Sequence, residues 1–192
     1  GEVFKTNTPV SDLIQRTSLN DGSFDNIIDG SSCTLIKLPI SVKVNGQEIL
    51  LESPDDFNTI EKILDSSDDD DDRVVITYPV TVILADYSEI TLNNESDLED
   101  LVDECIENGN DDDIECVDFK YPLEIAIYDS ENQISNVITI NNDKSLHNFM
   151  DDLDDDEFAS FNFPLTVTLS DGAEMTVSNN DDLEEVLENA ID

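Results

Sequence analysis

Residues 163–172 read FPLTVTLSDG, and this stretch decides the predicted fold. A bulky residue and a proline precede alternating apolar residues, the pattern of a half-buried strand. Asp171-Gly172 follows, a dipeptide typical of tight hairpin turns, so a return strand is expected at 174–177. A helix is expected next, because Asn179 is a favourable N-cap and apolar residues then recur at helical spacing.

The same pattern occurs four times along the chain, with successive prolines separated by 40, 43 and 42 residues. The bulky residue and proline stand at Leu38-Pro39, Tyr78-Pro79, Tyr121-Pro122 and Phe163-Pro164. Self-similarity at a fixed period is typical of a repeat architecture. We therefore expect an α+β protein of four tandem strand-strand-helix (ββα) repeats, which form antiparallel sheet with helices packed on one face. The first strand of each repeat is expected to continue through its proline with a kink.

The spacing places the repeats at 33–72, 73–115, 116–157 and 158–192. Residues 1–32 lack the pattern but contain short apolar groups at helical spacing, such as Leu13 with Ile14 and Phe24 with Ile27. We expect this N-terminal helical segment to cap the exposed end of the first repeat, as terminal segments do in repeat arrays.

The charge is strongly acidic, with 48 Asp or Glu residues against 8 Lys or Arg and a formal net charge of -40. Nucleic acids and anionic membranes bind Lys/Arg surfaces, so neither is expected as a partner. Hydrophobic residues make up 38% of the chain and are clustered enough to build a core. The chain has no apolar run of membrane-spanning length, so direct membrane insertion is not expected.

Acidic clusters recur where each of the first three predicted helices ends. Carboxylates there face the negative end of the helix dipole and each other, so a bound cation would offset the repulsion. Calcium takes six to eight oxygen ligands, which Asp/Asn-rich loops can supply. The candidate ligands are Asn108, Asn110, Asp111, Asp112 and Asp113 in the leading cluster, then Asp68, Asp70 and Asp72, and Asp152, Asp154 and Asp156. The alternative is a solvated acidic loop that binds no specific ion, since none of these runs has the EF-hand spacing.

No catalytic residues are assigned. The sequence contains one histidine, His147, which is expected on the surface, and no glycine-rich phosphate loop or G-x-S-x-G motif. A non-catalytic protein is therefore expected. The alternative is a hydrolase that uses a carboxylate pair at a junction between repeats. A second alternative is an acidic nucleic-acid mimic that binds basic proteins, since a strongly charged fold attracts opposite charge at long range.

Three cysteines leave the redox state open between a disulfide and free thiols. A disulfide between Cys105 and Cys116 would join a helix end to the next strand over a short loop. Cys33 would then be left over, either buried or available for an intermolecular bond.

One resemblance covers nearly the whole chain. It rests on Ser11-Asp12-Leu13-Ile14, on residues 20–29 (NDGSFDNIID), on Ser32-Cys33 and on residues 163–172. These stretches resemble hypothetical secreted lipoproteins of marine Bacteroidetes, a group without an established activity. The resemblance implies export to the periplasm, the outer membrane or the cell exterior, with a lipid anchor upstream of residue 1. Because residue 1 is Gly rather than Met, the chain is expected to be a mature product without its export signal.

These expectations combine into one functional hypothesis. The protein is expected to be a non-catalytic exported or cell-surface protein that acts through structure or protein interaction, with its acidic loops as candidate calcium sites. No other cofactor is expected.

Overall fold

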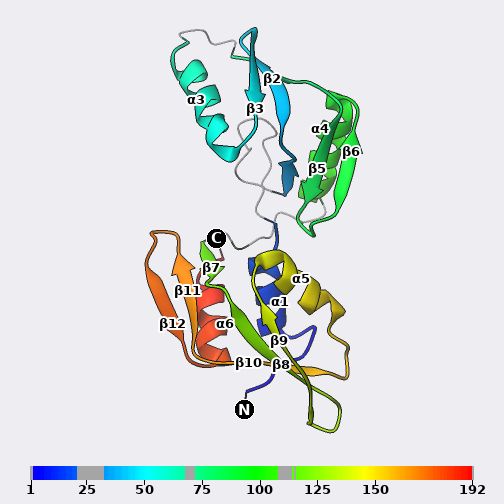
Figure 1. Cartoon of the computed structure of the whole chain (residues 1–192), viewed down its shortest axis with the longest axis vertical. Helices are drawn as coiled ribbons and strands as arrows, with labels where there is room; N and C mark the ends of the chain where they lie inside the picture. Colours follow the sequence, from blue (N-terminus) through cyan, green and yellow to red (C-terminus); the bar gives the residue numbers. More distant parts are fainter. Residues whose placement is uncertain (1, 21–32, 68–71, 108–113, 115, 192) are drawn as a thin grey trace. The chain divides into compact units, whose positions relative to one another are not determined.

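The computed structural model describes residues 2–20, 33–67, 72–107, 114 and 116–191. These residues form a mixed α+β fold of four three-stranded antiparallel sheets and five α-helices, without a closed barrel (Figure 1). The chain divides into two compact units: unit 1 comprises residues 1–19 and 112–192, and unit 2 comprises residues 20–111. Among the helices described, none has the length and apolarity that crossing a membrane requires.

Unit 2 contains two sheets, with strand orders β3-β2-β4 and β1-β5-β6. Its elements are β1 (Thr34–Ile36), β2 (Ile40–Val44), β3 (Gln47–Leu51), a 3-10 turn η2 (Pro54–Asp56), α3 (Phe57–Asp65), β4 (Val74–Ile76), β5 (Val80–Leu84), β6 (Glu89–Leu92) and α4 (Glu95–Glu107). β4 pairs with β2, so that Val75 lies opposite Lys43, and β1 pairs with β5, so that Leu35 lies opposite Ile83. Each half of the unit therefore gives its first strand to the hairpin of the other half.

Unit 1 has the same exchange of first strands, with sheets ordered β10-β8-β9 and β12-β11-β7. Its elements are α1 (Pro9–Thr17), β7 (Val117–Phe119), β8 (Leu123–Tyr128), β9 (Ile134–Ile140), α5 (Asp143–Asp152), β10 (Phe158–Phe161), β11 (Leu165–Leu169), β12 (Glu174–Val177) and α6 (Asn180–Glu188). β10 pairs antiparallel with β8, and β7 pairs antiparallel with β11.

The prolines mark where the chain changes sheets, rather than kinks within one continuing strand. At each of the four bulky residue-proline pairs, all of which have cis peptide bonds, the chain leaves a strand of one sheet and enters a strand of another. Three strands, rather than the expected two, precede each of the helices α3, α4, α5 and α6. The expected antiparallel sheet with helices on one face is accordingly divided into four small sheets. The division into repeats at 33–72, 73–115, 116–157 and 158–192 stays a prediction.

Local sequence signals are confirmed where the structure shows them. Asn45 and Gly46 both have the positive φ values, 50° and 85°, that their hairpin dipeptide predicts. In the Asp171-Gly172 turn only Gly172 has a positive φ, 83°, because the turn is wider and is closed by the Leu169 N–H, which donates to the Ala173 carbonyl. Asn179 caps α6, since its side chain accepts the backbone N–H of Asp182 at 2.8 Å.

Each unit has its own apolar core. In unit 2 the fully buried side chains include Val42, Val44, Leu51, Ile60 and Val82. In unit 1 they include Ile14, Ile125, Leu146, Val167 and Leu183. Both cores draw on strands and helices from both halves of their unit, which is why the exchanged strands are held in place.

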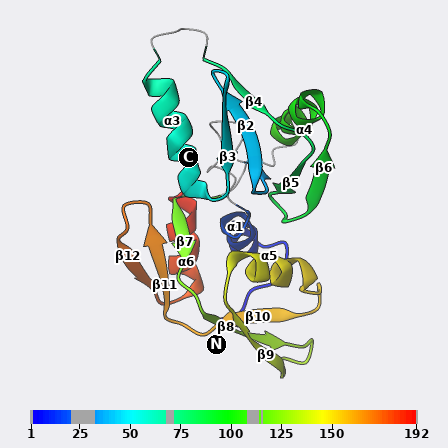
Figure 2. The ribbon, with the colours of Figure 1, turned by 45° about the horizontal axis from the view of Figure 1, so that its top comes forward.

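Residues 1–19 of the N-terminal segment belong to unit 1, while the expectation that the segment at 1–32 caps the first repeat stays a prediction. α1 lies between α5 and α6 and packs against both (Figures 1 and 2). Upstream of it, Phe4 pairs antiparallel with Ala159 of β10 through backbone hydrogen bonds of 2.8 and 2.9 Å. Its ring stacks on Phe161 with centroids 5.4 Å apart. The apolar face of α1 predicts burial, but it does not say which pair of helices provides the partner surface.

We expect Ile14→Ala to destabilise unit 1 by about 3 kcal/mol, because it removes a fully buried side chain and leaves a cavity between α1 and its neighbours. Chemical denaturation with hydrogen-exchange mass spectrometry would measure this, and protection should fall in 116–191 but not in 33–67. Ile134→Ala is the matched control, since Ile134 is 59% exposed and its loss should cost less than about 0.5 kcal/mol. Lost protection in 33–67 alone would contradict the placement of α1.

Candidate functional site

Most of the predicted calcium ligands lie outside the described residues. These are Asp68, Asp70, Asn108, Asn110, Asp111, Asp112 and Asp113. The described ones are engaged in the fold or exposed: Asp72 Oδ1 accepts a 2.8 Å hydrogen bond from Asn45 Nδ2, which links the β2–β3 turn to the start of β4. Asp152 ends α5, and Asp154 and Asp156 lie in the exposed turn that follows.

The turn at Asp154 is closed by its own hydrogen bonds. The Glu157 N–H donates to the Asp154 carbonyl, and Glu157 Oε1 accepts the Asp154 N–H, both at 3.1 Å. Within the described ranges, no three His, Cys, Asp or Glu side chains lie together in a way that could hold a metal ion. Calcium binding in the acidic loops therefore stays a prediction.

The disulfide joins Cys33 to Cys105, with Cα atoms 6.5 Å apart, while Cys116 is a free thiol. This corrects the predicted pairing of Cys105 with Cys116. Cys33 directly precedes β1, and β1 joins the β5–β6 hairpin, whose helix is α4. Strand exchange thus brings Cys33 to Cys105 on α4, whereas Cys116 leads into β7 of unit 1. The sequence favoured the Cys105–Cys116 pairing because it closes the shorter loop. The exchange of first strands leaves no signal in the local sequence.

We expect reduction of this disulfide to destabilise unit 2 by about 4 kcal/mol, since the cross-link spans 72 residues and constrains the unfolded chain. Non-reducing peptide mapping should recover a Cys33–Cys105 peptide, and thermal melting with and without a phosphine reductant should show the loss. Cys116→Ser is the control and should leave both the peptide map and the melting shift unchanged. A mapped Cys105–Cys116 peptide would contradict the observed pairing.

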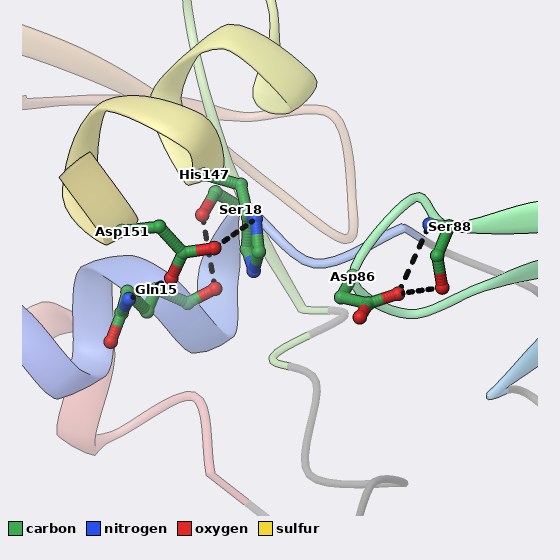
Figure 3. Close-up of polar contacts among 6 residues, drawn as sticks. All are labelled: Gln15, Ser18, Asp86, Ser88, His147 and Asp151. Carbon is green, nitrogen blue, oxygen red and sulfur yellow. Dashed lines mark hydrogen bonds and ion pairs between the residues drawn. The ribbon is translucent and has the colours of Figure 1, made fainter.

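His147 is buried rather than on the surface, with 6% of its area exposed. It lies on α5, where its Nδ1 is 3.5 Å from Asp151 Oδ2 (Figure 3). Asp151 in turn accepts a 3.0 Å hydrogen bond from Gln15 Nε2, so this polar group links α5 to α1. The expectation of an exposed His147 was wrong because α1, which covers it, comes from outside the segment at 116–157. The group serves helix packing.

A groove of about 530 Å³ lies in unit 1 where the two prolines Pro122 and Pro164 approach each other. Its polar side chains come from both halves of the unit, the kind of junction at which the hydrolase alternative placed its site. They bond to neighbours: Asn162 Nδ2 donates to Glu124 Oε2 at 3.0 Å, and Tyr121 Oη donates to Asp143 Oδ1 at 2.5 Å. Among the described lining residues Glu124 is the one carboxylate, so this groove does not contain a carboxylate pair.

A second groove, of about 360 Å³, lies in unit 2 between β4 and α4, which run beside each other in Figure 2. We call it the β4–α4 groove. Its floor is apolar and one wall is acidic: it is lined by Val74, Val75, Ile76, Tyr78, Leu98 and Val102, and by Glu95, Glu99 and Asp103. The three carboxylates are spaced four residues apart on α4, which places them along one side of the helix.

The hydroxyl of Tyr78 is buried in the structure and has no hydrogen-bond partner among the described residues. Burial raises the pKa of this hydroxyl, and the negative charges of Glu95, Glu99 and Asp97 raise it further. Tyr121 occupies the corresponding position before a proline in unit 1, and there the hydroxyl donates to Asp143. The β4–α4 groove thus combines three features: the Tyr78 hydroxyl without a partner among the described residues, a row of carboxylates, and apolar side chains.

The sequence prediction missed this groove, although two of its signals are visible in the sequence. Glu95, Glu99 and Asp103 recur at a helical spacing, and Tyr78 stands before a repeated proline. What the sequence could not show is that β4 leaves its own hairpin and becomes the outer strand of the β3-β2-β4 sheet beside α4. Asp86 stabilises its turn locally, since its Oδ1 accepts the backbone N–H of Ser88 at 3.0 Å (Figure 3).

Comparison of the chain with models of protein families, with curated proteins and with solved structures finds no match.

Proposed function

We propose that the protein is a non-catalytic exported or cell-surface protein that acts by binding another protein, with calcium as an additional ligand of its acidic loops. The observation that carries the binding role is the β4–α4 groove, where half-exposed apolar side chains lie beside a row of carboxylates. Such a combination is typical of a surface that receives a partner, since apolar area gives affinity and charge gives specificity. Export rests on the resemblance to secreted lipoproteins.

The polar chemistry of the described grooves favours binding over hydrolysis. In the unit 1 groove the Glu124 carboxylate is held by Asn162. In the β4–α4 groove the carboxylates lie on one helix, and the described lining contains no histidine, serine or cysteine. General acid–base catalysis needs two groups, one on each side of the reacting bond. Their different surroundings must give them different pKa values. Neither groove, as far as its described lining goes, supplies that arrangement.

The finer architecture of four ββα repeats is part of this proposal. Its support is local likeness between the segments: each has a bulky residue and proline before its second strand, and Asn94, Asn142 and Asn179 accept helix N-terminal amides at 2.8 to 2.9 Å. In a duplicated ββα segment, the hydrophobic strands of each copy need a second copy to cover them. This explains why two segments share one core.

We expect the full-length chain to bind a defined cationic protein, horse cytochrome c, with a stoichiometry near one and with an affinity that weakens as salt rises. Isothermal titration calorimetry at low and at physiological salt would measure both quantities. Ribonuclease-sized neutral proteins serve as controls and should show no heat of binding. A titration without saturation at any salt would contradict a protein-binding site, and so would turnover of ester or glycoside substrates that Glu124→Gln abolishes.

For calcium, we expect millimolar CaCl2 to raise the melting temperature more than NaCl or MgCl2 at matched ionic strength, because a specific ligand stabilises the folded state by mass action. The substitution Asp112→Asn should reduce the calcium-specific part of the shift. Glu48→Gln is the control, because Glu48 is exposed on β3 and lies outside the acidic clusters. Equal shifts with all three salts would contradict a specific calcium site and would show that the salts act only by screening the repulsion between carboxylates.

A further inference from the structure

Unit 1 shows how an extended segment can occupy the space between an edge strand and a helix. Phe4 pairs antiparallel with Ala159 on the outer edge of β10, and its side chain is 4% exposed. Two residues earlier, Glu2 accepts a 2.5 Å hydrogen bond from the backbone N–H of Asn180, at the start of α6. The Val3 carbonyl accepts from Asn180 Nδ2 at 3.2 Å. The segment 2–4 therefore lies between β10 and α6 and is joined to the edge of β10 by one antiparallel bridge.

The β4–α4 groove is the counterpart of this filled site. Val74 precedes Pro79 by the same five residues that separate Ala159 from Pro164, so β4 corresponds to β10. Glu95 follows the cap residue Asn94 as Asn180 follows Asn179, so α4 corresponds to α6. No described segment of the chain pairs with the outer edge of β4.

Burial differs at matching positions of the two sites. In unit 1 the residues under the added segment are closed off: Ala159 and Leu187 are fully buried and Phe161 is 3% exposed. Their counterparts Val74, Val102 and Ile76 are only partly buried. Apolar surface that is covered in one unit is thus open in the other, and covering it would be favourable.

The backbone of β4 has hydrogen-bonding groups available for an added strand. Arg73 accepts from the Asn45 N–H and the Thr77 N–H donates to Ser41, so these residues direct their groups toward β2. Groups of alternate residues point to opposite sides of an antiparallel strand, which turns the N–H and C=O of Val74 outward. In unit 1 the corresponding groups of Ala159 are the ones that bond to Phe4.

We propose that the β4–α4 groove binds an extended segment of a basic partner protein, added antiparallel to β4, with a large apolar residue opposite Val74 and a lysine or arginine two residues before it. This inference rests on the proposed protein-binding function and names the site and the partner's chemistry. The position of the basic residue follows from the helix start. In unit 1 Glu2 reaches the first residue of α6, where it accepts the backbone N–H of Asn180, and the corresponding first residue of α4 is Glu95, whose side chain lines the groove and would attract a basic residue.

The spacing of the carboxylates fits an extended partner. Glu95, Glu99 and Asp103 recur along α4 at a rise of about 6 Å, and alternate side chains of a strand recur at about 6.6 Å. Basic residues two positions before and two positions after the apolar residue lie on the same face of an added strand, about 13 Å apart, and can therefore each reach one of the outer carboxylates, Glu95 or Asp103. Their aliphatic stems would lie on Leu98 and Val102, with the charged ends at the rim.

The test is a titration of the 15N-labelled full-length chain with the acetylated and amidated peptide Lys-Val-Phe-Lys-Thr, which copies residues 2–6 with lysine in place of Glu2. We expect saturable shifts of the amide signals of 74–76 and 95–103. The peptide Glu-Val-Phe-Lys-Thr should bind about fivefold more weakly, since it exchanges an attractive exposed ion pair for a repulsive one. Shifts that map elsewhere overturn the groove, and so does the absence of saturable shifts at 74–76.

Two variants separate strand addition from general attraction to an acidic protein. Val74→Pro removes the outward N–H, which an edge strand tolerates, and should abolish peptide binding, whereas Val74→Ile keeps the N–H and should bind as the native chain does. Glu95→Lys, at an exposed position, should reverse the preference in favour of the Glu-Val-Phe-Lys-Thr peptide. Unchanged binding to Val74→Pro or an unreversed preference overturns the groove, while the cytochrome c titration tests the proposed function independently.

Discussion

The reciprocal exchange of first strands within each unit is the constraint on which the rest of the structure depends. β1 completes the β5–β6 hairpin and β4 completes the β2–β3 hairpin, so neither half of unit 2 has a three-stranded sheet without the other. A two-stranded hairpin is at best marginally stable in water, and a third strand together with a packed helix supplies the apolar area that stabilises it. The exchange therefore makes two short segments into one cooperative core, and it places Cys33 at the helix that carries Cys105.

The same exchange creates the edges at which binding can occur. A strand that crosses to another hairpin pairs on one side only, so β4 and β10 become outer strands of their sheets. Uncovered edges invite pairing with other chains, and proteins cover or charge them. Residues 2–4 cover β10, while the edge of β4 is flanked by the carboxylates of α4. The chain thus protects one outer strand by covering it and the other by placing charged side chains beside it. Only the strand beside the charges leaves room for a partner.

The sequence predicted the features that depend on neighbouring residues, and it did not predict those that depend on pairing. Strand alternation, the Asn45-Gly46 turn and the Asn179 cap are set within a few residues, where backbone conformation and side-chain hydrogen bonds decide the outcome. The partner of each strand, the position of α1 between α5 and α6, the burial of His147 and the Cys33–Cys105 disulfide all join segments far apart in sequence. The four segments share one sequence pattern, so periodicity alone cannot choose which of them pair. The β4–α4 groove was missed for this reason, although its carboxylate spacing was visible.

The charge of -40 has two separable consequences for binding. Spread over the surface, it attracts any cationic protein at long range, and salt weakens that attraction without favouring one partner over another. At the β4–α4 groove α4 holds three carboxylates in a row beside apolar side chains and the hydroxyl of Tyr78, which has no hydrogen-bond partner in the described part of the chain. A basic segment that comes near the protein surface gains only the long-range electrostatic attraction. A basic segment that extends along β4 also gains backbone hydrogen bonds and apolar contacts. The groove can therefore select among cationic partners by their ability to form a strand, which net charge cannot do.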